Sequence, residues 1–333
     1  MPGLSHRICV APMMECTDRH QRYFMRLITR YAVLYTEMIT VAALLNGDRG
    51  RLLRFDRSEH PVALQLGGSD HVNMASCARL GEDFGYDEIN INVGCPSPRV
   101  SAGRFGACLL YEPETIAECV AAMCGAVDIP VTVKTRIGLD RDESATRLYE
   151  LVGLAGQAGC TTFIVHARNA WLDGLSPKQN RDVPPLRYEA VHALKRDFPQ
   201  LEIVINGGIR DMRDVRGHLH HCDGAMLGRE AYANPYLLID VDREFYGADG
   251  EPQTRAAILR RLLPYVERQI AEGVPLSAIT RHILGLYRGR PGARVWRRKV
   301  CEGSRVPGAG AATLREIASL VEEWTPPARR VSV

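Results

Sequence analysis

Residues 7–18 read RICVAPMMECTD, and the turn inside this stretch decides between two fold classes. The first residues form a short, near-continuously apolar run, as expected for a parallel strand that is buried on both faces. In an open, doubly wound sheet, the turn after the first strand usually carries the glycine-rich phosphate fingerprint GxGxxG. Here the turn reads APMMECTD and contains no such fingerprint. The stretch therefore favours a closed barrel over a doubly wound sheet.

Further apolar runs follow the first, and a pattern typical of a helix separates each run from the next. The strands that we predict are Arg7–Pro12, Val33–Met38, Val62–Leu66, Glu88–Val93, Val131–Thr135, Thr162–His166, Glu202–Ile205 and Gly224–Leu227. The clearest helical segments between them are Val72–Phe84, Pro113–Cys124, Asp142–Ala158 and Pro185–Arg196. Eight strand–helix units in about 240 residues are typical of a TIM (β/α)8 barrel. We therefore predict a TIM barrel domain over residues 1–245.

The strand pattern ends after Phe245, and residues 246–252, YGADGEP, are typical of a linker. The helical patterns beyond it are Arg255–Glu272, Pro275–Tyr287, Ala293–Cys301 and Ala311–Trp324. Residues 251–333 carry 15 Lys/Arg against 7 Asp/Glu, whereas residues 1–250 carry 27 against 32. We predict a small all-helical basic domain over residues 252–325. Its charge indicates a polyanionic partner, although a solvated helical face explains the charge equally well.

Composition excludes several other classes of protein. The chain of 333 residues is 46% hydrophobic and 24% charged, which is ordinary for a soluble globular protein. No apolar run reaches the length of about 20 residues that a membrane span needs, and no signal peptide pattern opens the chain. Ten cysteines without a CxxC pair disfavour zinc ribbons and a disulfide scaffold, so we expect a reducing, cytoplasmic location. We expect no metal site, because the HLHH run at 218–221 lies away from the strand ends.

The active site of a TIM barrel lies at the C-terminal ends of its strands. The sequence places a ring of residues there, namely Pro12–Met14, Glu37, Gln65, Asn92 with Cys95, Lys134, His166, Asn206–Gly208 and Gly228–Arg229. Packed strand residues would be apolar, so this ring predicts a site. The loops after the last two strands, NGG at 206–208 and GRE at 228–230, predict a phosphate site, since glycines let backbone N–H groups approach an anion. Tight turns between strand and helix are the alternative reading.

Lys134 and His166 end the fifth and sixth strands. An ammonium group inside a barrel mouth is costly unless an anion meets it. Together with Gln65, these side chains could hydrogen-bond a flat heterocycle while Met13 and Met14 pack on its face. For an isolated histidine, a packed imidazole is the alternative.

The blocks at these strand ends resemble the tRNA-dihydrouridine synthases, an FMN-dependent family. They are APMM (11–14), LYTEM (34–38), QLGGSD (65–70), INVGCPS (91–97), VTVKTRIG (131–138), IVHAR (164–168), INGGI (205–209) and GRE (228–230). The resemblance covers essentially the whole chain, and no functional position departs from the pattern. Residues 171–186 and 279–298 resemble the A-type bacterial subgroup, which reduces uridines 20 and 20a in the D-loop of tRNA.

The resemblance implies a role for each member of the ring. FMN would be held by Pro12, Met13, Met14, Gln65, Lys134, His166, Asn206, Gly207, Gly208, Gly228 and Arg229. Hydride from N5 of the reduced flavin would go to C6 of the uracil, and Cys95 would give a proton to C5. Asn92 would contact the target base, and tRNA would be oriented by Lys178, Arg181, Arg294 and Arg297. NADPH, or NADH in its place, would reduce the flavin, and we expect a monomer that needs no protein partner and no membrane.

The residues themselves support two of these roles. A thiol with a reference pKa near 8.5 is mostly protonated at neutral pH yet still a usable acid, and Gly94 and Pro96 would hold Cys95 in a tight loop. A buried structural thiol is the alternative. On a helix, Arg294, Arg297 and Arg298 share one face, which suits a phosphate backbone. A solvated face with a packed Trp296 is the alternative there.

Two other functions remain open from the sequence. A flavin barrel acting on a small molecule, such as a relative of dihydroorotate or enoate reductases, explains the phosphate loops but not the basic helical appendage. A non-catalytic RNA chaperone explains the basic surface and predicts a colourless protein, whereas a flavoprotein is yellow.

Overall fold

The barrel strands form one closed parallel sheet in the computed structural model, which describes residues 4–142 and 144–322. The strands are β1 (Ile8–Val10), β2 (Val33–Tyr35), β4 (Val62–Gly67), β5 (Glu88–Val93), β6 (Val131–Arg136), β7 (Thr162–His166), β8 (Glu202–Asn206) and β9 (Gly224–Leu227). Each pairs with its neighbours along the chain, and β9 pairs with β1. The short β3 (Ile39–Thr40) adds to the end of β4, while β2 also pairs with β4 and thereby closes the ring. The predicted TIM barrel and all its predicted strands are confirmed.

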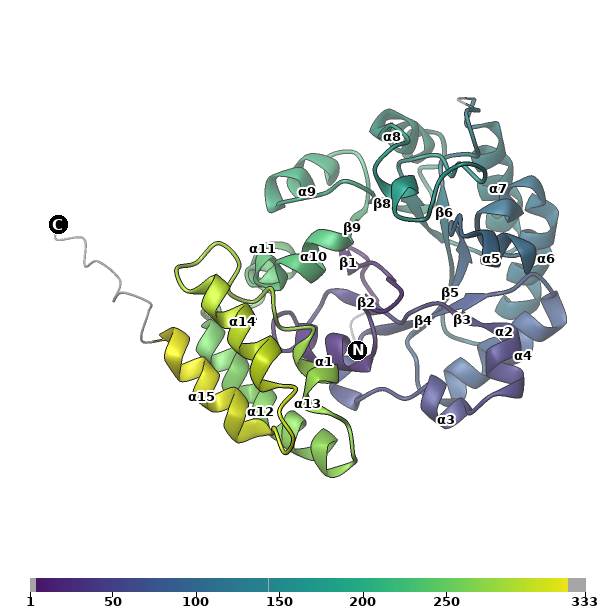
Figure 1. Ribbon diagram of the computed structural model, residues 1–333. Coiled ribbons are helices and arrows are strands. Elements are labelled where there is room, and N and C mark those ends of the chain that lie inside the picture. Colours follow the sequence, from purple (N-terminus) through teal and green to yellow (C-terminus); the bar gives the residue numbers. More distant parts are fainter. Residues whose placement is uncertain (1–3, 143, 323–333) are drawn as a thin grey trace, which may run out of the picture. The chain divides into compact units, whose positions relative to one another are not determined.

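Helices cover the outside of the barrel (Figure 1). They are α2 (Val41–Asn46), α3 (Arg49–Leu52), α4 (His71–Asp83), α5 (Pro98–Ala102), α6 (Pro113–Cys124), α7 (Thr146–Gln157), α8 (Tyr188–Asp197) and α9 (Met212–His218), with single turns η1 (Arg57–Glu59), η2 (Gly106–Tyr111) and η3 (Gln179–Arg181). Local sequence sets their starts, since Asp70 and Asp211 cap α4 and α9 and Pro113 opens α6. Helix α7 begins later than predicted, because Asp142 and Ser144 fold into turns before it.

The inside of the barrel is apolar on one side and polar on the other. A cluster of buried side chains comes mainly from β1, β2 and β7–β9, namely Cys9, Ala11, Val33, Tyr35, Ala63, Ile164, Val204 and Met226. Successive side chains of a strand point to opposite faces, so the buried polar side chains of β4–β6 line the opposite wall. They are Gln65, Glu88, Asn90, Asn92, Thr132 and Arg136.

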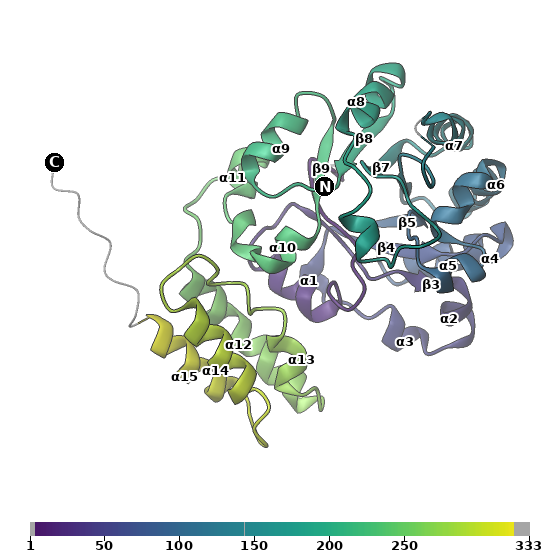
Figure 2. The same cartoon turned by 45° about the horizontal axis from the view of Figure 1, so that its top comes forward.

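The chain divides into two compact units, residues 1–19 with 31–228, and residues 20–30 with 229–333. The second unit holds α1 (Arg19–Arg26) for most of its length and the helices α10 (Arg229–Ala233), η4 (Pro235–Leu238), α11 (Val241–Tyr246), α12 (Arg255–Ala271), α13 (Leu276–Thr280), α14 (Ala293–Gly303) and α15 (Ala311–Glu322). Both α12 and α14 pack against α15 (Figure 2). The helical C-terminal part is therefore as predicted. The linker-based boundaries 1–245 and 252–325 stay a prediction about separately folding domains.

One predicted helix is wrong. The pattern at Pro275–Tyr287 is helical only over α13, and turns follow it. A Cβ on Gly285 would lie 2.4 Å from the carbonyl oxygen of Ala233, so this segment packs closely against the backbone at Ala233 and position 285 has no room for a side chain. The indole of Trp296 is fully buried and donates from Nε1 to the carbonyl oxygen of Ile283 at 3.1 Å, which fixes this segment. No helix in the part of the chain that the structure describes has the length and apolar character to cross a membrane.

Candidate active site

Strand register brings the predicted polar residues together in neighbouring pairs near the C-terminal ends of the strands. Asn92 lies beside Lys134 on neighbouring strands, and His166 lies beside Asn206 on the next pair. The Nζ atom of Lys134 donates to Oδ1 of Asn206 at 3.0 Å, although β7 separates their strands. The side chains of Lys134 and Asn206 therefore meet over the barrel interior.

Lys134 has an electrostatic environment that suits an anion. Burial, together with the nearby guanidinium of Arg136, lowers the pKa of Lys134 to about 7, and Cys95 acts in the opposite direction. Its hydrogen bond to Asn206 goes to a neutral oxygen, which does not balance a charge. An anionic group placed beside Nζ would restore the charged form.

The NGG loop after β8 exposes backbone rather than side chains. Gly207 and Gly208 have φ of +112° and +71°, a region that favours glycine. A Cβ on Gly207 would lie 3.3 Å from the His166 ring, and the hydroxyl of Tyr188 donates to the Gly207 carbonyl oxygen at 2.9 Å. Asn206 is anchored by its Nδ2, which donates to the carbonyl oxygen of Met226 at 2.7 Å. The loop is thus held on both sides with glycine backbone next to His166.

The loops after β9 and β1 approach each other. A Cβ on Gly228 would lie 3.7 Å from Cβ of Ala11 and 3.9 Å from the sulfur of Met13. The turn after β1 is closed by Thr17, whose backbone N–H and hydroxyl both donate to the Met13 carbonyl oxygen. Pro12 and Met13 are half-buried in this turn, whereas Met14 is 59% exposed. Arg229 follows Gly228 directly and is the first residue of α10.

Cys95 sits on a turn that Asn92 holds. Oδ1 of Asn92 accepts the backbone N–H groups of Gly94 at 3.1 Å and Cys95 at 3.0 Å. The carbonyl oxygen of Cys95 in turn accepts the N–H of Ala107 at 2.9 Å. These hydrogen bonds fix the backbone of Cys95, and the residue is only half-buried.

Arg136 is a site residue that the sequence reasoning missed. Its Nε donates to the Gly94 carbonyl oxygen at 2.9 Å, and its Nη1 donates to the carbonyl oxygens of Asn169 and Asn180 at 2.9 and 3.0 Å. Burial lowers the pKa of Arg136 to about 10, so the guanidinium stays charged at neutral pH. It connects the Cys95 turn to the loop after β7. The available signal was its place two residues after Lys134, on the same face of β6.

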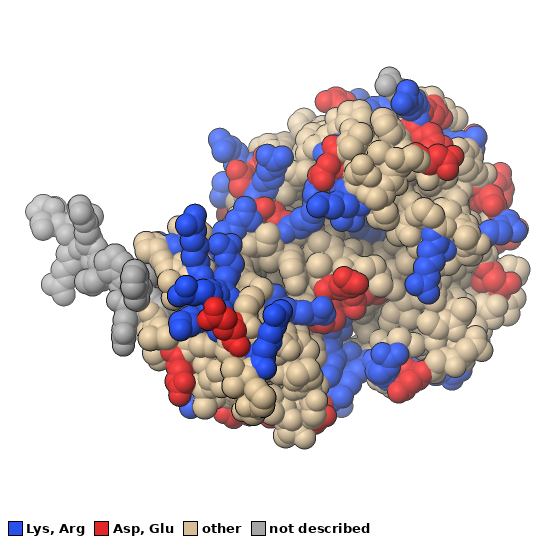
Figure 3. Space-filling model, in the orientation of Figure 1, with Lys and Arg blue, Asp and Glu red and all other residues tan. Residues whose placement is uncertain are grey.

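The predicted RNA-contacting cations are all exposed. Lys178 and Arg181 flank η3 in the loop after β7, and Arg294 and Arg297 lie on α14. The two pairs belong to different compact units. Figure 3 shows Lys and Arg side chains gathered over the helical unit. The buried Trp296 beside them contributes packing and not an exposed stacking surface.

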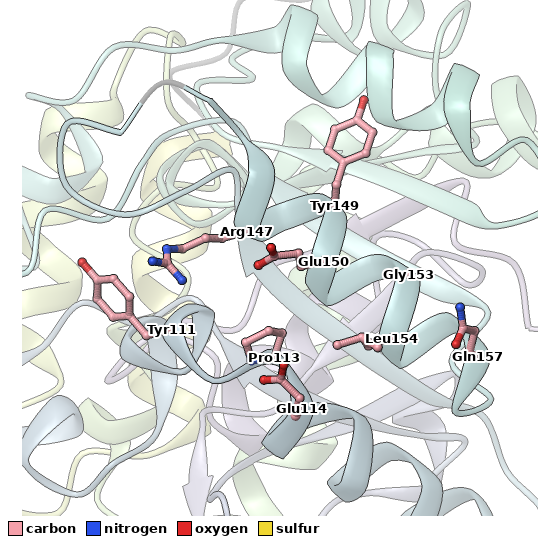
Figure 4. A pocket seen from close by; sticks show the side chains of 9 residues that line it. All are labelled: Tyr111, Pro113, Glu114, Arg147, Tyr149, Glu150, Gly153, Leu154 and Gln157. Atoms are coloured by element: carbon pink, nitrogen blue, oxygen red, sulfur yellow. The ribbon is translucent and has the colours of Figure 1, made fainter.

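A pocket of about 470 Å³ lies outside the ring, where η2 and α6 meet α7 (Figure 4). Arg147 lies over the ring of Tyr111 there, 4.6 Å from its centroid, and carboxylates of Glu114 and Glu150 line the same pocket. None of the predicted site residues lines it. Among the described residues, no group of three or more His, Cys, Asp or Glu side chains is arranged to hold a metal ion.

The strand-end ring and the basic helical unit together match one known family. A model of that family, described as dihydrouridine synthase (Dus), matches residues 9–322. The chain belongs to the dihydrouridine synthase family.

Curated members of the family match this chain along nearly its whole length. One from Vibrio cholerae is 51% identical over 94% of this chain and 95% of its own, and one from Synechocystis is 55% identical over 92% of both chains. One from Escherichia coli O6:H1 is 50% identical over 97% of this chain and 99% of its own. All three are named tRNA-dihydrouridine(20/20a) synthase.

A solved structure shares the fold of this dihydrouridine synthase family member at low identity. It is a 2-naphthoyl-CoA reductase in complex with 2-naphthoyl-CoA, with a TM-score of 0.53 and 10% identity. The match covers 71% of this chain and 49% of that chain. The likeness concerns the fold alone.

Proposed function

We propose that this protein reduces the C5–C6 double bond of uridine in tRNA to 5,6-dihydrouridine, at positions 20 and 20a of the D-loop. FMN is the bound cofactor, and NADPH is the reductant. The observation that carries the proposal is the meeting of Lys134 with Asn206 at the mouth that also holds the Cys95 turn. Relatives of 50–55% identity that bear the name tRNA-dihydrouridine(20/20a) synthase support the choice of substrate.

The residues of the ring fit a flavin mononucleotide. The NGG backbone with its two positive φ angles suits a phosphate, as does Gly228 followed by Arg229. Lys134, Asn206 and His166 bring hydrogen-bonding groups to the mouth where a flat ring would lie, and Gln65 adjoins them through its hydrogen bond with Asn92. When bound and reduced, FMN supplies a hydride at its N5. Lys134 would hold a proton next to the negative charge of the reduced ring, because an adjacent anion raises the pKa of Lys134 from about 7.

Cys95 gives the proton that completes the reduction. Addition of a hydride at C6 and a proton at C5 saturates the double bond, and the thiolate left on Cys95 regains a proton from solvent. Asn92 holds the turn through two backbone N–H groups, so the thiol is aimed without being enclosed. General acid catalysis of this kind contributes about 10²–10⁴-fold in rate.

The substrate uridine must leave its stack to reach a barrel mouth, at a cost of a few kcal/mol that is smallest in a loop. Lys178 and Arg181 lie in the loop after β7, on the same unit as Cys95, and Arg294 and Arg297 offer phosphate contacts on α14. These cations orient the tRNA so that the D-loop meets the barrel.

The test is a single-turnover experiment without oxygen. The purified protein should be yellow, and tRNA should reoxidise its NADPH-reduced flavin with formation of dihydrouridine at positions 20 and 20a. Cys95→Ala should keep the flavin and lose most of this rate, whereas Cys124→Ala, a half-buried thiol at the end of α6, should keep both. A colourless protein, or a small enone substrate that replaces tRNA, would contradict the proposal.

A further inference from the structure

A continuous chain of side-chain hydrogen bonds runs from the Cys95 turn into the barrel. Its first member is Asn92, whose Nδ2 donates to Oε1 of Gln65 at 2.8 Å. Nε2 of Gln65 donates to Oδ1 of Asn90 at 2.7 Å, and Nδ2 of Asn90 donates to Oγ1 of Thr132 at 2.8 Å. The hydroxyl of Thr132 donates to Oε1 of Glu88. Three strands, β4, β5 and β6, therefore contribute to one chain.

The chain ends at an ion cluster at the opposite end of the strands, in which His6 and Glu88 are buried and Glu202 is half-buried. Nε2 of His6 meets the other oxygen of Glu88 at 2.6 Å, and its Nδ1 meets Glu202 at 2.7 Å. Burial alone would lower the pKa of His6, but the two glutamates outweigh it and raise the pKa to about 10. His6 is therefore charged at neutral pH and donates from both nitrogens. Tyr35 also donates to Glu88, at 3.0 Å.

The ion cluster determines which group donates and which accepts in each hydrogen bond of the chain from Glu88 to Asn92. A carboxylate oxygen only accepts, so the Thr132 hydroxyl must donate downward and accept from Asn90. Asn90 must then turn its oxygen to Gln65, and Gln65 must turn its oxygen to Asn92. Reversal of any one amide would place two donors or two acceptors face to face. The members are between 0% and 9% exposed, which leaves little room for water to repair a reversed bond.

We propose that Glu88 and Thr132 are positioning residues that set the orientation of the Gln65 and Asn92 amides and thereby hold the Cys95 turn. The last step follows from Asn92, which has its oxygen free for the N–H groups of Gly94 and Cys95 because its nitrogen is turned to Gln65. The proposal rests on the proposed function only for the chemistry of Cys95. The direction of the amides is independent of it.

The test removes the hydroxyl that joins the hydrogen-bond chain to Glu88 of the ion cluster. Thr132→Val removes the hydroxyl between Asn90 and Glu88, and Thr132→Ser restores it. Thr162→Val is the matched control, because Thr162 is also a buried threonine that donates to a carboxylate of the ion cluster, Glu202, at 2.8 Å, but it lies outside the chain from Asn92 to Glu88. Asn90→Leu cuts the chain one link higher and serves where Thr132→Val does not fold.

The readout is hydrogen exchange of the Gly94 and Cys95 backbone amides, which needs neither cofactor nor tRNA. Thr132→Val should speed this exchange by about tenfold or more, since exchange follows the opening of the local hydrogen bond. Thr132→Ser and Thr162→Val should leave it at the wild-type rate. Wild-type exchange in Thr132→Val, or equal acceleration in Thr162→Val, would overturn the proposal.

Two further measurements separate this proposal from the proposed function. Thr132→Val should lower the rate of flavin reoxidation by tRNA with little change in the KM for tRNA, and Thr132→Ser should rescue it. If the exchange result holds but the wild-type protein does not act on tRNA, the positioning role stands and the proposed function fails. If the wild-type protein acts on tRNA and exchange is unchanged, the positioning role fails alone.

Discussion

Gly106 should be intolerant of a side chain because it lies against the backbone of Cys95. It opens η2 with φ of +79°, and a Cβ there would lie 2.7 Å from the Cys95 carbonyl oxygen and 2.5 Å from Cγ1 of Val100. The next residue, Ala107, donates its N–H to the same carbonyl oxygen. Gly106→Ala therefore pushes directly on the turn that carries the thiol.

The expected cost has two parts. An L-residue in the left-handed region costs about 1–2 kcal/mol, and overpacking adds about 1–3 kcal/mol, so the free energy of unfolding should fall by about 2–5 kcal/mol. Ordinary contact begins at 3.4 Å, so the Cys95 carbonyl oxygen must move by about 0.7 Å if it alone yields. A misplacement of about 1 Å can cost about 10²-fold in rate, and we therefore expect a loss of about tenfold or more.

Gly85→Ala is the matched control for this prediction. Gly85 has φ of +93°, but the nearest atom to its added Cβ is Cζ of Phe55 at 4.0 Å. It should lose about 1–2 kcal/mol from backbone strain and keep the wild-type rate. The assays are urea unfolding and the anaerobic reoxidation of reduced flavin by tRNA. If Gly106→Ala kept the wild-type rate and lost no more stability than Gly85→Ala, the close contact would not be what holds Cys95.

Three further predictions follow from charges. Binding of reduced FMN should take up a proton at pH 8 and weaken as the pH rises above about 7, because the anionic reduced ring raises the Lys134 pKa from about 7. Anaerobic calorimetry in two buffers measures this uptake, and Lys134→Gln should abolish it. Substitution of Glu for both Arg294 and Arg297 should weaken tRNA binding and reduce the slope of log K against log salt concentration by about 2. An unchanged slope would contradict the assignment, as would the same effect from substitution of Glu for Arg260 and Arg261 on α12. The raised pKa of His6 contributes stability that is complete below about pH 6.5 and is lost towards pH 10, so the difference in free energy of unfolding between wild type and His6→Gln should shrink over that range. The lowered pKa of Lys134 has the opposite effect on stability, and the comparison with the variant cancels it. A constant difference would show that His6 is not charged in the folded state.

The fold could be predicted because most barrel strands are apolar on both faces. Runs such as Val62–Leu66 and Glu202–Ile205 stand out against the helices, and their ends locate the site without any tertiary information. The strand register then brings Asn92 beside Lys134 and His166 beside Asn206. The ring could thus be named from the sequence, although the pairing of Lys134 with Asn206 across β7 could not.

Other features depend on contacts that are distant in the sequence. Helix α13 ends at Thr280, and the close approach of Gly285 to Ala233 beyond it cannot be predicted from the local pattern at 275–287. Arg136 lies just beyond the predicted strand Val131–Thr135, and its partners are the carbonyl oxygens of Gly94, Asn169 and Asn180. Every residue has a backbone carbonyl oxygen, so the sequence cannot show which ones accept from Arg136. The role of Arg136 in joining two loops is therefore visible only in the structure.

The stretch EININV of β5 is among the runs that predict strands apolar on both faces, yet its apolar and polar residues alternate strictly. Ile89 and Ile91 face the helices, and Gly81 of α4 comes so close that a Cβ there would lie 2.5 Å from Cδ1 of Ile89. Glu88, Asn90 and Asn92 face the interior and are all buried. This reverses the usual arrangement, in which the apolar face of a strand is the one turned to the core.

Such a reversal is tolerable in a closed barrel because each strand has two buried faces. The outward face of β5 packs against helices and supplies the apolar burial that folding needs, which releases the inward face from that task. The inward face can then carry polar groups, provided that each finds a partner, and here the partners follow in one unbroken order from Asn92 to Glu88. Removal of one hydrogen-bonding side chain from this chain leaves the next side chain without its partner. The same residues that make this wall of the barrel polar therefore also fix the geometry at its mouth.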